Sequence, residues 1–137
     1  MNLCKIKEDN RIIRMFSESA PCGAPRNIGS ELETEIYFGK YWVPDSRDCY
    51  AVTAVGDSMI GAHIFDGDML VINCGVEPAN GRVVVAWLNG ELTVKRLFID
   101  GGRIELRPDN AFYRTITISE DDDFRVLGVV TSVHREL

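Results

Sequence analysis

Short apolar runs separated by turn residues occupy the chain from Tyr50 onward. In chain order the runs are YAVTAVG, DMLVIN, GRVVVAWL, ELTVKRLF, RIELRP, YRTITI and FRVLGVVTSVH. Many of their residues are β-branched or alternate with polar ones, which favours strands. DGD at 66–68, NG at 89–90 and DGG at 100–102 favour tight turns between them. The pattern predicts about seven strands in a compact, mostly antiparallel β-fold with no long helix.

Residues 1–45 lack a sustained hydrophobic period and are rich in charges and turn-forming residues. Their prolines and glycines include Pro21, Gly23, Pro25, Gly29 and Pro44. This composition predicts a flexible N-terminal arm and linker over 1–45 and one folded domain over 46–137. A short helix over residues 8–16 is an alternative for the first part of the arm.

Composition narrows the classes of function. The chain is 45% apolar, which is enough to form a core, and its net charge is -6 with a pI near 4.9. An acidic chain lacks the basic surface that binds duplex DNA, so direct sequence-specific DNA binding is not expected. The N-terminus has no apolar signal-peptide core, and no run is long enough to span a membrane.

The metal-ligating residues are scattered along the chain. The cysteines are Cys4, Cys22, Cys49 and Cys74, and the histidines are His63 and His134. No two cysteines form a CxxC pair and the histidines are far apart, so neither a metal nor another cofactor is expected. Without a signal peptide, reduced thiols in the cytoplasm are favoured over disulfides.

Ser58 follows the first strand-like run, within VGDSM. Gly-Asp-Ser is ordinary turn composition, so Ser58 is either a turn residue or a nucleophile. The motif is not GxSxG, because residue 60 is isoleucine. His63 and Asp66 are the nearest acid–base residues, but a catalytic triad usually draws its members from separate parts of a fold. Three members around one turn would align poorly.

A lysine is the other base that can activate a serine. The chain has four lysines, Lys5, Lys7, Lys40 and Lys95, and only Lys95 lies within a predicted strand. Alternation places Lys95 and Arg96 on opposite faces, so one of them points toward the more buried face or its rim. Burial lowers the pKa of a lysine, as a general base requires. A charge on the strand surface remains the other interpretation.

Five motifs in order extend this picture: VGDSM, I.DGDMLVI, G.VVVA...GE.TVKRL, RPDNAFY and VLGVV. Together they resemble the LexA/UmuD family of self-cleaving serine peptidases, of the S24 type, over roughly residues 50–135. The resemblance implies a highly bent β-fold of the LexA C-terminal-domain type. It also implies that Ser58 is the nucleophile and Lys95 the general base. The backbone N–H groups of Ser58 and Met59 are candidate oxyanion donors.

The resemblance further implies a substrate within the same chain. The family cuts itself at Ala-Gly or Cys-Gly, and the matching bond here is Cys22-Gly23, in SAPCGAPR. Small residues let the backbone enter a narrow cleft in an extended form. A RecA filament on single-stranded DNA is the implied co-protease.

The 21 residues before Cys22 are too few for a helix-turn-helix domain. The expectation is therefore the UmuD-like branch, in which a homodimer of the trimmed form, 23–137, serves a Y-family polymerase subunit (UmuC-like). Its role would be translesion synthesis in the SOS response. An alternative is a non-enzymatic β-domain that dimerises and docks a DNA polymerase, with Ser58 inert. A signal-peptidase-like enzyme would need a membrane anchor.

Overall fold

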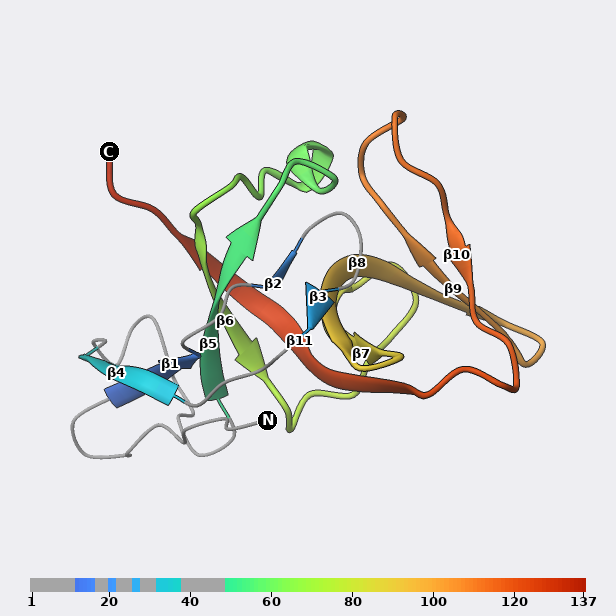
Figure 1. Cartoon of the computed structure of the whole chain (residues 1–137), viewed down its shortest axis with the longest axis horizontal. Helices are drawn as coiled ribbons and strands as arrows, with labels where there is room; N and C mark the ends of the chain where they lie inside the picture. The colour runs from blue at the N-terminus through green and yellow to red at the C-terminus, as the bar shows by residue number, and fades with distance from the viewer. Residues whose placement is uncertain (1–11, 17–19, 22–25, 28–31, 38–48) are drawn as a thin grey trace.

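The computed structural model describes residues 12–16, 20–21, 26–27, 32–37 and 49–137 (Figure 1). The strands are β1 Ile12–Phe16, β2 Ala20–Pro21, β3 Arg26–Asn27, β4 Leu32–Tyr37, β5 Cys49–Val55, β6 Met69–Asn73, β7 Val83–Leu88, β8 Glu91–Asp100, β9 Arg103–Arg107, β10 Ile116–Thr117 and β11 Phe124–His134. One short 3-10 helix, η1, covers Ile60–Ala62. No helix in these described ranges is long and apolar enough to cross a membrane.

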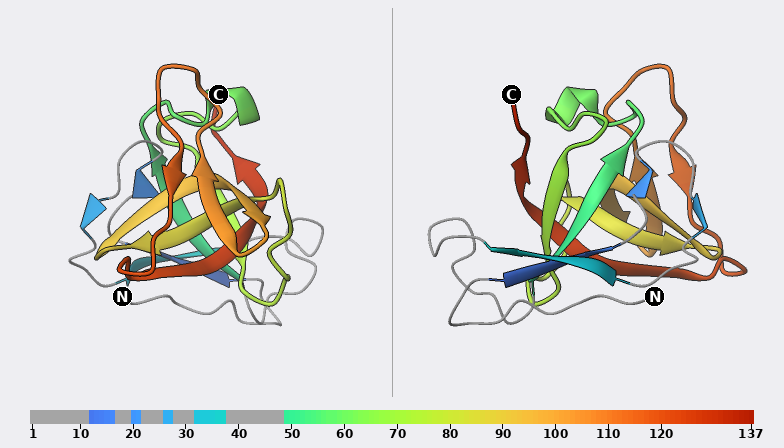
Figure 2. Two further views of the ribbon diagram at one scale, coloured as in Figure 1. Left: turned by 90° about the vertical axis from the view of Figure 1, so that its right-hand side faces the viewer. Right: turned by 60° about the vertical axis from the view of Figure 1, so that its left-hand side comes forward.

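The strands form one sheet in the order β10-β9-β8-β7-β11-β6-β5-β1-β4. Every neighbouring pair from β10 through to β5 is antiparallel. Figure 2 shows β5 and β6 standing across the direction of β7 and β8, so the sheet is strongly bent. The predicted compact, mostly antiparallel β-fold is confirmed.

The long strand β11 joins the two halves of the bent sheet. Its first part pairs with β7 and its second part with β6, with register shifts between Val126 and Gly128 and between Val130 and Ser132. Such irregularities bend a strand and increase its twist. A Cβ at Gly128 would lie 3.2 Å from the Asn73 carbonyl oxygen, so the crossing strand approaches β6 closely.

Most predicted strands lie where the hydrophobic pattern placed them. Asn89 and Gly90 join β7 to β8 with positive φ angles of 49° and 89°, as the expected two-residue turn requires. The YRTITI run was predicted as a full strand, but only Ile116–Thr117 pairs, as β10. The residues before it belong to the connection from β9, whose polar groups contact the turn around Ser58 instead.

The predicted arm contains strands. The alternative of a helix over 8–16 is wrong for its described part, because Ile12–Phe16 is β1. This strand pairs with β4 and, through Met15, runs parallel to β5 at Ala51. Two consecutive isoleucines favour a strand, and the edge of β5 supplies a partner that local propensity cannot reveal. The rest of that predicted helix, residues 8–11, lies outside the described residues.

Among the described residues, two clusters of buried side chains lie on opposite faces of β7, because Val85 belongs to one and Val84 and Ala86 to the other. The first contains Val52, Ala54, Met59, Ile64, Leu70, Ile72, Val85, Leu92 and Val94. The second contains Val84, Ala86, Leu88, Leu97, Leu106 and Val129. Met59, which directly follows Ser58, is completely buried in the first cluster. Apolar packing therefore anchors one side of the Ser58 turn.

Candidate active site

Ser58 lies in the turn that leads from β5 into η1. The turn begins at Gly56, whose φ of 90° suits glycine. The Ser58 side chain is 0% exposed, and its Oγ has no hydrogen-bond partner among the described residues. Leaving a buried hydroxyl unpaired costs about 1–3 kcal/mol. Such a group is uncommon in a folded protein and calls for an explanation, of which chemistry is one.

Lys95 lies in the middle of β8 and is 1% exposed. Its Nζ donates to Thr93 Oγ1 at 2.8 Å and to the Val94 carbonyl at 3.2 Å. Its neighbour Arg96 points to the rim, where its side chain is 30% exposed and pairs with Asp109. The prediction that one of the two cations faces the buried side is therefore confirmed, and that cation is Lys95.

The segments that flank residues 22–25 pair with β5, which leads into the Ser58 turn, and with β8, which carries Lys95. On one side, β2 runs parallel to β5, with Ala20 opposite Ala54 and Pro21 opposite Val55, just before the Ser58 turn. On the other side, β3 is antiparallel to β8, with Arg26 opposite Leu92. Figure 1 shows β2 beside β5 and β3 beside β8. Cys22 and Gly23 themselves lie outside the described residues.

His63 and Asp66 shape the turn rather than approach Ser58. His63 is exposed, ends η1 with a φ of 60°, and accepts a hydrogen bond on its carbonyl from Arg135 at 2.9 Å. The Asp66 carboxylate accepts from the Gly56 N–H at 2.8 Å. Neither side chain hydrogen-bonds Ser58 Oγ. The expected misalignment of a Ser-His-Asp triad within this turn agrees with the structure.

Comparison with known proteins identifies the family. The family described as Peptidase S24-like matches residues 14–131. The chain belongs to the Peptidase S24-like family. This confirms the resemblance to the LexA/UmuD family of peptidases. In this S24-like domain, no group of three or more described His, Cys, Asp or Glu side chains could hold a metal ion.

The chain is similar to several LexA repressors. It is 40% identical over 129 residues to the LexA repressor of Desulfatibacillum aliphaticivorans, covering 92% of this chain and 61% of the relative. For that of Magnetococcus marinus the identity is 48% over 106 residues, with 74% and 46% covered. The chain thus spans about half to three-fifths of the length of these relatives. All of them are named LexA repressors, which gives the expected UmuD-like branch no support.

Sequence reasoning missed the role of the connection between β9 and β10 in this S24-like domain. Asn110 Nδ2 donates to the Asp57 carbonyl at 2.9 Å, and the Tyr113 hydroxyl donates to the Asp57 carboxylate. The Gly61 N–H donates to the Asp109 carbonyl at 2.8 Å. Figure 2 shows this connection rising beside η1. The RPDNAFY motif was the available signal, but the sequence assigned no role to its residues.

A second polar cluster lies at the other end of the connection between β5 and β6, around Asp68. Asp68 is 2% exposed, and its two carboxylate oxygens each accept a bond from Arg135 at 2.7 Å. It also accepts from the Phe65 N–H at 2.8 Å. The hydrogen bonds from Arg135 hold the pKa of Asp68 below its usual value, against the opposing effect of burial. The Arg135 guanidinium also lies over the Phe65 ring, 4.7 Å from its centroid.

Proposed function

We propose that the chain cuts its own Cys22-Gly23 bond, with Ser58 as nucleophile and Lys95 as general base. The observation that supports this best is a convergence on two strands. The strand β5 leads to a buried serine and holds β2, while β8 carries a buried lysine and holds β3. The four residues between β2 and β3, 22–25, contain the expected cleavage site.

The proposed reaction has two steps. Lys95 takes the hydroxyl proton as Ser58 Oγ bonds to the carbonyl carbon of Cys22. Lys95 then gives that proton to the Gly23 nitrogen as the peptide bond breaks, leaving an ester between Ser58 and Cys22. Water attacks the ester with Lys95 again as base, which frees Ser58 and leaves a new carboxylate at Cys22.

Burial is what allows a lysine to act in this way. Burial removes the water that stabilises a charged ammonium. The neutral amine is therefore more favoured at a buried site than it is in aqueous solution. Lys95 is 1% exposed, and Thr93 Oγ1 accepts one of its N–H bonds, which orients the amine. We also propose the backbone N–H groups of Ser58 and Met59 as oxyanion donors, because N–H groups of the turn that carries the nucleophile can face the developing oxyanion.

Because the substrate is part of the same chain, its effective concentration at the site is high. The rate is therefore limited by how often the chain adopts the conformation that can be cut, and not by substrate binding. We propose that a RecA filament on single-stranded DNA stimulates cleavage by raising the population of the competent state. The unit that cleaves would be a homodimer. Within each chain, the arm and linker over 1–45 would contain the cleavage site, and the peptidase domain would cover 46–137.

The names of the relatives favour a regulatory role over a polymerase role. Because they are LexA repressors, we propose that cleavage between Cys22 and Gly23 switches off a repressor of the SOS response. A repressor acts at DNA, so these relatives count against the expectation that the protein makes no sequence-specific contact with DNA. Partnership with a Y-family polymerase has no support in these relatives.

Mass spectrometry of the purified chain, incubated with RecA, single-stranded DNA and a nucleotide, tests the proposal. We expect a fragment that begins at Gly23 and its complement that ends at Cys22. Ser58→Ala and Lys95→Ala should each abolish both fragments. Identical fragments from the Ser58→Ala chain would point to a contaminating protease. An intact wild-type chain would favour the alternative of a non-enzymatic binding module.

A further inference from the structure

No hydrogen bond from a described residue fixes the position of the Ser58 side chain. Its Oγ has no hydrogen-bond partner among the described residues, so its direction depends on the backbone on either side. On the C-terminal side, Met59 is completely buried and fixes the chain in the core. On the N-terminal side, Asp57 is exposed and has no such anchor in the core.

The connection between β9 and β10, residues 108–115, supplies that missing anchor. Asn110 holds the Asp57 carbonyl and Tyr113 holds the Asp57 carboxylate, so both polar ends of this residue are fixed. The same connection reaches past Ser58, where the Asp109 carbonyl accepts from the Gly61 N–H at 2.8 Å. A Cβ at Gly61 would lie only 2.7 Å from that oxygen, which makes the contact specific to glycine. The Ser58 turn is therefore held from both sides.

The same connection is also tied to the strand that carries Lys95. Both oxygens of the Asp109 carboxylate accept from Arg96, Oδ2 from Nη2 at 2.5 Å and Oδ1 from Nε at 3.3 Å. Arg96 Nη1 donates in turn to the Gly81 carbonyl at 2.6 Å. The hydrogen bond that Arg96 donates to Asp109 raises the pKa of the Arg96 guanidinium. Bidentate pairs of this kind fix geometry as well as charge.

We propose that Asn110 and Tyr113 are positioning residues for the Ser58 nucleophile, and that Asp109 keeps their loop in register with the β8 strand beside Lys95. The proposal rests on the proposed function, because it concerns the same nucleophile. A displacement of the nucleophile by about 1 Å can reduce a rate about 100-fold, so bonds outside the reacting atoms can control it.

The test uses the full chain and measures two rates. The first is self-cleavage at alkaline pH without a helper, and the second is covalent reaction of Ser58 with a small fluorophosphonate, which does not need the arm. Tyr113→Phe removes one hydroxyl and Asn110→Ala removes one amide. We expect each to slow both reactions by about 10- to 100-fold. The midpoint of the pH–rate profile should not move, because the contacts of Lys95 are unchanged.

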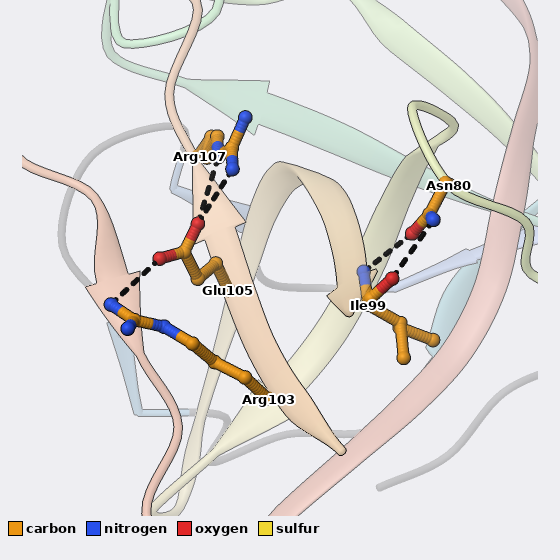
Figure 3. A network of polar contacts seen from close by, with 5 residues as sticks. All are labelled: Asn80, Ile99, Arg103, Glu105 and Arg107. Carbon is orange, nitrogen blue, oxygen red and sulfur yellow. Dashed lines mark hydrogen bonds and ion pairs between the residues drawn. The ribbon is translucent and has the colours of Figure 1, made fainter. Parts of the chain in front are cut away.

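Asn80 offers a matched control. Its side-chain amide also clamps backbone, donating to the Ile99 carbonyl at 2.9 Å and accepting from the Ile99 N–H, at the far end of β8 (Figure 3). Asn80→Ala should lower the melting temperature as much as Asn110→Ala does, yet leave both rates within about twofold of wild type. Asp57→Asn keeps an acceptor for Tyr113 and should react nearly as fast as wild type, whereas Asp57→Ala should be slow.

Three results would overturn the positioning role. They are wild-type rates in Tyr113→Phe and Asn110→Ala, a loss of rate in Asn80→Ala as large as theirs, and slow self-cleavage with unchanged fluorophosphonate reaction. The last result would mean that the loop positions the arm that is cut, and not the Ser58 nucleophile. Failure of the proposed function looks different, because the wild-type chain itself would then neither cleave nor react with the fluorophosphonate, and both proposals would fall.

Discussion

Ser58 and Asp68 lie in one segment between β5 and β6, and both are buried polar side chains with opposite surroundings. Asp68 accepts three hydrogen bonds, two from Arg135 and one from the Phe65 N–H. Ser58 Oγ has no partner among the described residues. A satisfied buried group stabilises a fold, whereas an unpaired one destabilises it. If Ser58 is the nucleophile that we propose, the comparison separates a residue that stabilises the fold from one that is left unpaired for reaction.

The largest expected effects come from replacing each of these two residues by alanine, one at a time. Ser58→Ala should abolish self-cleavage, by at least about 10³-fold. Its free energy of unfolding should stay the same or rise, because alanine removes an unpaired hydroxyl. Asp68→Ala should lower the free energy of unfolding by about 1–3 kcal/mol while the folded fraction still cleaves. Urea unfolding and cleavage assays measure both, and equal destabilisation by the two variants would contradict the comparison.

A smaller effect is expected from acid. Because Arg135 lowers the pKa of Asp68, its contribution to stability is complete above the unfolded-state pKa, about 3.9, and is lost as pH falls through the folded pKa. Thermal unfolding between pH 7 and 3 should show wild type losing stability below about pH 4. Asp68→Asn should start lower and fall less steeply. If stability falls with pH equally in wild type and Asp68→Asn, Asp68 does not contribute to the loss of stability in acid.

The smallest effect is expected at an exposed polar cluster. On β9, Glu105 forms ion pairs with Arg103 at 3.0 Å and with Arg107 at 2.7 Å (Figure 3). Arg103 is 65% exposed, and solvent screens such pairs. Arg103→Ala should shift the melting temperature by no more than about 2 °C and leave cleavage unchanged. A larger shift in scanning calorimetry would mean that exposed pairs matter as much as the buried Asp68 cluster.

Local pattern was enough to predict β5 to β9 and β11, and to predict that one of two adjacent cations on β8 faces the buried side. Alternation along β8 placed Lys95 and Arg96 on opposite faces, and turn chemistry placed Asn89 and Gly90 between β7 and β8. The bonds from Asn110 and Tyr113 to Asp57 could not be predicted in this way. They join positions more than fifty residues apart, and no period or turn motif carries that information. The pairing of β1 with β5 was missed for the same reason.

The central claim is that Ser58 cuts Cys22-Gly23 with neutral Lys95 as its base. The most direct test is the helper-free rate of self-cleavage across neutral to alkaline pH, with Ser58→Ala as the blank. The rate should rise as pH passes through the pKa of Lys95 in the folded protein and then level off, because only the neutral amine accepts the proton. A flat profile over that range, or cleavage by Lys95→Ala at the wild-type rate, would contradict the account.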